Sequence, residues 1–383
     1  MADIHGTFDE RFAPVADVLS ANLDTGKDVG ASVCVVHDGQ TVVDIWGGTI
    51  DDDGTPWAED TIINVWSTTK TMTFLSALLL ADRGELDFHT PVARYWPEFA
   101  ANGKDSIEVR HLMAHTAGLA SWVEPIDETD LYDWEKATSL LAAQAPMWEP
   151  GTASGYHALT QGYLVGEVIR RVTGGTTVGE LFAKEIATPL GADFHIGTAP
   201  EHDHRVARVI PPPQSLSADL LEMDPDSVIV KSLRNPALEA SWSWTEPWRR
   251  AEIPAAGGHG NARSVARAQS VVSHGGEVDG IRLLSPAGVE AIFERQISGT
   301  DMVLQAPLTL GMGYGISSPE MPIGPNERTC FWGGWGGSIV VNDLENRLTV
   351  AYVMNRMGEG TTGDDRGIGI LFATYGVIVG ALG

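Results

Sequence analysis

The four residues Ser67-Thr68-Thr69-Lys70 are the clearest group with the right types and spacing for chemistry. They follow a strand-like run at 62–66 and open an amphipathic, apolar-periodic segment that predicts a helix ending near Gly84. Residues three apart in a helix share one face, so the Lys70 amine can reach the Ser67 hydroxyl. A helix N-terminus also favours developing negative charge. The spacing therefore predicts a serine nucleophile beside a lysine.

Lysine suits such a site because burial can depress its pKa, whereas arginine stays protonated at any working pH. Of the six lysines in the chain, Lys70 alone has a serine three positions before it. Ser-x-x-Lys also arises by chance, and the same four residues describe an N-cap serine followed by a solvated lysine. The motif alone leaves both interpretations open.

Further blocks around this motif resemble a known family. The chain from about residue 10 to 380 is similar to serine hydrolases of the class C β-lactamase and penicillin-binding-protein fold, especially the family VIII carboxylesterases. Five blocks in the family's order are more specific than one motif. They lie at 67–70, 83–92, 109–119, 150–151 and 154–156.

The resemblance implies the other members of the site. Tyr156 matches the tyrosine of the family's Tyr-x-Asn element, here followed by His157 and Ala158, and would share proton transfer with Lys70. Trp332-Gly333-Gly334 resembles the family's third element, which implies an oxyanion hole formed by the backbone N–H groups of Ser67 and Trp335. Without the resemblance, Tyr156 could equally be a core residue with a paired hydroxyl.

Departures from the family pattern bear on the substrate. Ala158 lacks the side-chain amide of the family's asparagine, and Trp332 replaces a cation that would pair with a lactam carboxylate. Both argue for uncharged esters, with Trp332, Gly333, Gly334 and His157 expected near the substrate. Trp242 and Trp244 either line the cleft as well or cover the helical part of the chain.

Several functions remain open from the sequence. The favoured one is a serine carboxylesterase that hydrolyses small to medium esters through an acyl-enzyme. The rivals are a β-lactamase or D-amino peptide hydrolase, an acyltransferase of the same fold, and a non-catalytic acyl-binding sensor. No cofactor or metal site is predicted: Cys34 and Cys330 are interpreted as buried thiols, and 201–204 as a solvated loop. No Gly-x-Ser-x-Gly elbow is present to pair with His115.

The elements that must position these residues form an α+β fold. Two β-branched runs, 33–37 and 41–46, flank an Asp-Gly turn, and a similar pair lies at 338–342 and 347–354. We therefore expect an antiparallel sheet, flanked by helices, from both ends of the chain (1–66 and 258–383). A mainly helical lobe (67–257) would be inserted between them, with the site in the cleft. The stretch 241–254 has no clear period and is predicted to be loop.

The charge composition of the chain argues against some classes of binding partner. Twenty-five basic against fifty-one acidic residues give a net charge of −26, which disfavours nucleic acid and anionic membranes. The apolar segment 367–383 is too short and glycine-rich for a membrane span and is predicted to be a helix packed on the sheet. The start of the chain lacks a secretion signal, so the cytoplasm is the expected compartment. A homo-oligomer is compatible with the sequence, which leaves the oligomeric state open.

Overall fold

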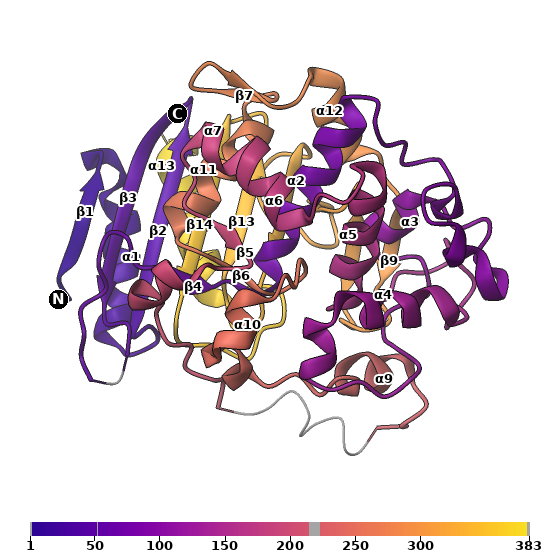
Figure 1. The fold of residues 1–383 in the computed structure, drawn as a ribbon. Helices are drawn as coiled ribbons and strands as arrows, with labels where there is room; N and C mark the ends of the chain where they lie inside the picture. The colour runs from indigo at the N-terminus through magenta and orange to yellow at the C-terminus, as the bar shows by residue number, and fades with distance from the viewer. Residues whose placement is uncertain (1, 52, 214–222, 381–383) are drawn as a thin grey trace.

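The main element of the fold is a nine-stranded antiparallel sheet. The computed structural model describes residues 2–51, 53–213 and 223–380. Figure 1 shows strands from the end of the chain (yellow) beside strands from its start (indigo), so the predicted sheet from both ends is confirmed. In spatial order the strands are β1 (Ile4–Phe8), β3 (Gln40–Gly48), β2 (Gly30–His37), β14 (Leu348–Met354), β13 (Ile339–Asp343), β12 (Thr329–Gly333), β11 (Gly315–Ile316), β10 (Pro307–Leu310) and β9 (Ile297–Thr300).

The first hairpin forms where the Asp-Gly pair predicts it. Asp38 and Gly39 have φ angles of 48° and 76°, and His37 pairs with Gln40 across the turn. Positive φ at both turn residues gives a backbone twist that matches the twist of the flanking strands. The second predicted pair is also confirmed, as β13 and β14.

Helices cover both faces of the sheet, and every residue of β14 is therefore buried. Helix α11 (Ala262–Ser273) packs on β2, β13 and β14, while α1 (Ala13–Asp24) and α13 (Asp365–Gly380) pack on each other. The helix predicted for 367–383 is confirmed up to residue 380, and the last three residues lie outside the described part. Among the described residues, no helix combines the length and apolarity needed to cross a bilayer.

The middle of the chain is mainly helical, as predicted. The predicted helix after Ser67 forms, but it is not amphipathic: all its residues from Thr69 to Leu80 are buried, because helices on several sides enclose it. The helices of this region are α2 (Thr69–Asp82), α3 (Val109–Met113), α4 (Trp134–Ala143), α5 (Thr160–Val172), α6 (Val178–Phe182), α7 (Thr188–Leu190), α9 (Val228–Arg234) and α10 (Glu246–Arg250), with α12 (Pro286–Glu290) following α11. The two-lobe division with boundaries at 66 and 258 stays a prediction.

Two stretches predicted to be loops contain short helices. In 241–254, a 3-10 helix (Ala240–Trp244) precedes α10, whose first turn is capped by the Thr245 side chain and anchored by buried Trp248. The predicted solvated loop at 201–204 lies in a 3-10 helix (Pro200–Arg205) that is tied down by ion pairs from Asp203. Helices of five or six residues are too short to show a hydrophobic period.

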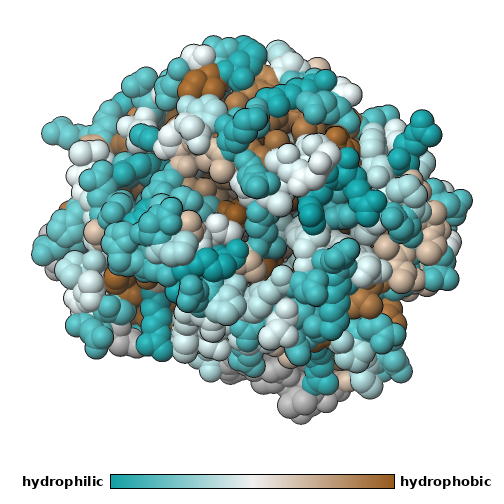
Figure 2. Space-filling view, viewed as in Figure 1, coloured by the Kyte–Doolittle hydropathy of each residue, from teal (hydrophilic) through white to brown (hydrophobic). Residues whose placement is uncertain are grey.

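The face of the molecule shown in Figure 2 is mainly hydrophilic, in agreement with the large number of acidic residues in the sequence. Apolar residues lie on this face in small separate groups. Cys34 and Cys330 are buried free thiols, as predicted.

Candidate active site

Ser67 lies in a short 3-10 turn (η2, Trp66–Thr68) between the two-residue strand β4 (Ile63–Asn64) and α2. The preceding residue, Trp66, has a φ of 49°, a left-handed conformation that is uncommon outside glycine. Its indole is buried against Trp248 and Trp335, with ring centroids 5.6 and 5.0 Å away. A left-handed conformation at a residue other than glycine costs on the order of 1–3 kcal/mol, and the packing of the indole holds Trp66 in it. The packing also fixes the backbone that leads through Ser67 into α2.

Lys70 is completely buried, and its amine has four oxygen neighbours. Nζ lies 3.1 Å from Ser67 Oγ and 3.1 Å from the Tyr156 hydroxyl, and it donates to the carbonyl oxygens of Ala158 at 2.6 Å and Ala255 at 2.9 Å. Burial lowers the pKa of Lys70 well below its usual value. When the amine is neutral, its two N–H groups donate to these carbonyl oxygens, so its one lone pair is left to accept the proton of the Ser67 hydroxyl.

Tyr156 closes a triangle with these two residues. Its hydroxyl donates to Ser67 Oγ at 2.5 Å. Burial raises the pKa of the phenol, and the hydrogen bond to Ser67 opposes that shift only in part. Burial therefore favours the protonated phenol and, in the nearby amine, the neutral form. The structure thus brings together the three side chains for which the sequence predicts catalytic roles.

The Trp332–Trp335 segment meets the Ser67 turn through a glycine. A Cβ added at Gly334 would lie 2.3 Å from the Val65 carbonyl oxygen and 3.3 Å from the Ser67 amide nitrogen, so no larger residue fits. The Ser338 hydroxyl, which donates to the same carbonyl at 2.9 Å, fastens the start of β13 to this turn. The segment that carries the Trp335 amide is therefore held directly beside Ser67.

Two residues with predicted substrate contacts lie behind the tyrosine instead. Trp332 is buried and stacks on His115, with centroids 5.5 Å apart. His157 is also buried: Nδ1 donates to the Gly155 carbonyl oxygen at 2.5 Å, and Nε2 accepts from the Leu119 amide at 3.0 Å. Neither side chain lines the cavity at Ser67. Trp332 packs against Tyr156 from outside the cavity, with ring centroids 5.7 Å apart, and His157 is the next residue in the chain.

The sequence motifs assign no role to His115, which forms part of this packing around Tyr156. It is buried, and its Nδ1 accepts the His157 backbone N–H at 3.0 Å. Its ring lies edge-on to that of Tyr156, with centroids 5.1 Å apart. Burial lowers the pKa of His115 well below its usual value, so the imidazole is neutral and can accept this hydrogen bond.

The buried histidines predict that stability falls on mild acidification. Burial lowers the pKa of His157 to about 4 and that of His259 to about 3, against 6.5 for a free side chain. Between these values the unfolded chain binds more protons than the folded one, so stability rises with pH there and is lost as the pH falls. Each histidine contributes up to about 1.4 kcal/mol per pH unit.

We expect the free energy of unfolding to drop by a few kcal/mol (~2–5) between pH 6.5 and 4.5. Urea unfolding at four pH values between 4.5 and 7.5 measures this, and the variant His157→Gln should show a shallower dependence. An unfolding midpoint that stays constant over this range contradicts the expectation.

A cavity of about 290 Å³ opens at Ser67 and Tyr156. None of the described residues that line it is charged. Much of its wall comes from parts of the chain that the sequence motifs do not mark. The apolar pair Ile229 and Leu233, four apart in α9, is the signal that could have indicated one of these parts. The apolar lining consists mainly of Leu159, Ile229, Leu233, Pro236, Leu238, Val303 and Leu304.

Trp242 and Trp244 do not line this cavity. The Trp244 indole donates to the Val209 carbonyl oxygen at 2.8 Å and lies under the Arg208 guanidinium, 4.1 Å from the ring centroid. Trp242 packs toward Trp248, with centroids 6.5 Å apart. Of the two expectations for these tryptophans, the structure agrees with a covering role.

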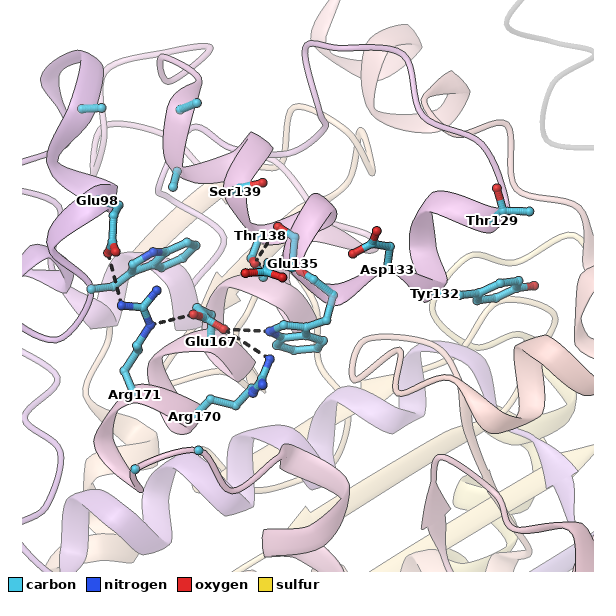
Figure 3. A pocket seen from close by; sticks show the side chains of 17 residues that line it. Glu98, Thr129, Tyr132, Asp133, Glu135, Thr138, Ser139, Glu167, Arg170 and Arg171 are labelled. Atoms are coloured by element: carbon cyan, nitrogen blue, oxygen red, sulfur yellow. Dashed lines mark hydrogen bonds and ion pairs between the residues drawn. The ribbon is translucent and has the colours of Figure 1, made fainter.

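A larger cavity of about 1200 Å³ lies between α4, α5 and a 3-10 helix (η4, Pro97–Gly103). Figure 3 shows that the charged groups at its centre pair with one another: Glu167 accepts from Trp134 at 2.7 Å and from Arg171 at 2.7 Å, and Arg171 also reaches Glu98. Ser67, Lys70 and Tyr156 do not line it. We therefore place the candidate site at the smaller cavity.

The comparisons with known proteins agree with the motifs. Residues 15–374 match the family model described as Beta-lactamase. The chain is 37% identical to the Mycobacterium tuberculosis protein named Esterase/beta-lactamase LipL, over 92% of this chain and 83% of that protein. The crystal structure of a family VIII carboxylesterase is 39% identical, with a TM-score of 0.91, and covers 98% of this chain and 100% of its own.

A penicillin-binding protein homologue from Caulobacter crescentus is 36% identical, also with a TM-score of 0.91, over 98% of this chain and 100% of that one. These matches confirm the resemblance that the ordered motifs indicate. The chain belongs to the beta-lactamase family.

Proposed function

We propose that the protein is a serine carboxylesterase that hydrolyses uncharged esters of small to medium size through an acyl-enzyme. The observation that carries the proposal is the triangle of Ser67, Lys70 and Tyr156 beside an apolar cavity that Ser67 and Tyr156 line. The names of the M. tuberculosis esterase and the family VIII carboxylesterase support it.

In the first half-reaction, Ser67 Oγ attacks the ester carbonyl carbon while its proton passes to the neutral Lys70 amine. The carbonyl oxygen becomes an oxyanion that the backbone N–H groups of Ser67 and Trp335 would stabilise. As the ester C–O bond breaks, Tyr156 gives its proton to the leaving alkoxide and regains one from Lys70. The buried, protonated phenol supports this role as a donor rather than as the primary base.

In the second half-reaction, water attacks the acyl carbon and one of its protons passes to the neutral Lys70 amine, which later returns it to Ser67 Oγ. The bond to Ser67 Oγ then breaks, Oγ is reprotonated, and the acid leaves. The reaction returns every group to its starting protonation state and draws only on side chains and backbone amides of this chain.

The cavity supports uncharged esters in preference to β-lactams. A lactam carboxylate would enter a space whose described lining residues include no cation, and an unpaired charge in such surroundings is costly. The lining comes from the predicted helical lobe (Leu159, Ile229, Leu233) and from the predicted sheet lobe (Val303, Trp335). This agrees with the proposal that the substrate enters between the two predicted lobes.

One experiment tests the reaction class. Nitrophenyl esters from acetate to octanoate and a chromogenic cephalosporin are assayed at equal enzyme concentration, and acid-quenched samples are mapped by mass spectrometry. We expect ester turnover with an acyl adduct on the peptide that contains Ser67, and a kcat/KM for the cephalosporin at least about tenfold lower. Faster cephalosporin turnover would indicate a β-lactamase, and a persistent adduct without turnover would indicate a sensor.

A further inference from the structure

Asp301 is a buried carboxylate that none of the sequence motifs marks. Its Oδ1 accepts three backbone N–H groups: Tyr156 at 3.0 Å, Val303 at 2.9 Å and Leu304 at 2.9 Å. Its Oδ2 is buried and has no hydrogen-bond partner within residues 2–51, 53–213 and 223–380. A carboxylate oxygen shared among three amides fixes their relative positions, because ionised acceptors form the stronger hydrogen bonds.

These amides belong to two different parts of the proposed site. Tyr156 carries the hydroxyl that meets Ser67, and Val303 and Leu304 form one wall of the cavity. The backbone reinforces the link, because the Met302 amide donates to the Ser154 carbonyl oxygen at 2.9 Å. The wall that would touch the substrate and the residue that would donate the proton are therefore held by one carboxylate.

We propose that Asp301 is a positioning residue that couples the fit of the substrate's apolar chain to proton transfer by Tyr156. The inference rests on the proposed esterase function. A chain that fills the cavity presses on the Val303–Leu304 wall, and Asp301 transmits the position of that wall to the Tyr156 backbone. A displacement near 1 Å at such a position can reduce a rate about 100-fold.

The test compares Asp301→Asn with a matched control, Asp343→Asn. Asp343 is also completely buried, and it accepts from Asn326, Asn346 and Tyr375 without contacting the site. For Asp301→Asn we expect kcat for a nitrophenyl acetate to fall at least about tenfold with little change in KM. We also expect the preference in kcat/KM for butyrate over acetate to shrink. Asp343→Asn should lower the melting temperature and leave both kinetic quantities unchanged.

A purely structural Asp301 would give the pattern of the control, which overturns the inference. Amide hydrogen exchange on the unmodified protein supplies a second test that needs no variant: the amides of Tyr156, Val303 and Leu304 should be protected to the same degree. Protection of Tyr156 with free exchange at Val303 and Leu304 would also overturn it. Failure of the proposed esterase function can be told apart from failure of this inference, because in that case the unmodified protein would show no ester turnover.

Discussion

Ser67→Ala will abolish ester hydrolysis, reducing kcat by about 10⁴-fold or more, to the background rate. The variant removes a hydroxyl that lies within hydrogen-bond distance of both the Lys70 amine and the Tyr156 phenol. It leaves the η2 turn unchanged, because the packing of Trp66 and the Gly334 contact do not involve the Ser67 side chain. Steady-state hydrolysis of nitrophenyl butyrate measures the effect, and circular dichroism checks the fold.

The matched control is Ser76→Ala in α2, the helix that follows Ser67. Ser76 is also buried, but its hydroxyl donates to the Met72 carbonyl oxygen at 2.8 Å and does not reach the site. The Ser76→Ala variant should hydrolyse the ester at the rate of the unmodified protein. Turnover by Ser67→Ala above the uncatalysed rate would refute the assignment of the nucleophile.

Lys70→Met has the second-largest expected effect, a fall in kcat of about 10²- to 10⁴-fold. Methionine is of similar length, but it has no lone pair of comparable basicity to take the Ser67 proton. Lys70→Arg should be equally impaired although it keeps a donor, because an arginine stays protonated and cannot act as a base. Burst kinetics with a nitrophenyl ester separate the loss of acylation from the loss of deacylation.

The variant Lys104→Met is the control for the loss of a buried lysine. Lys104 is also completely buried and donates to the carbonyl oxygens of Ala101 and Gln144, with no hydroxyl of the site among its hydrogen-bond partners. It should keep its esterase activity. If Lys70→Arg retains most of the activity, the amine acts as a donor rather than as the proton acceptor.

The sequence predicts the elements whose signals are local. The Asp38-Gly39 turn, the paired strands and the terminal helix all depend on neighbours in the chain, and all are present in the structure. Ser67 and Lys70 are also a local signal, because three residues of helix determine their geometry. Tyr156 required the family resemblance, since nothing in its own segment shows that it meets Ser67.

Other features depend on contacts between distant segments and on the backbone, so residue types do not reveal them. Burial lowers the pKa of Lys70, and its amine donates to the carbonyl oxygens of Ala158 and Ala255, atoms that any residue type would supply. Ala158 therefore lacks the side-chain amide of the family's asparagine, but its backbone carbonyl oxygen still contacts Lys70. The left-handed Trp66 conformation was likewise unpredictable, because it is held by Trp248 and Trp335 from remote parts of the chain.

The pairing of β2 with β14 has a consequence for biosynthesis. One edge of strand β2 pairs with residues 348–354, which leave the ribosome more than three hundred residues later. Until then the exposed edge of β2 is an aggregation hazard, and the amide of Trp335 is absent from the nucleophile it is proposed to serve. Nascent chains should thus show no ester hydrolysis and depend on chaperones until residues 348–354 have left the ribosome.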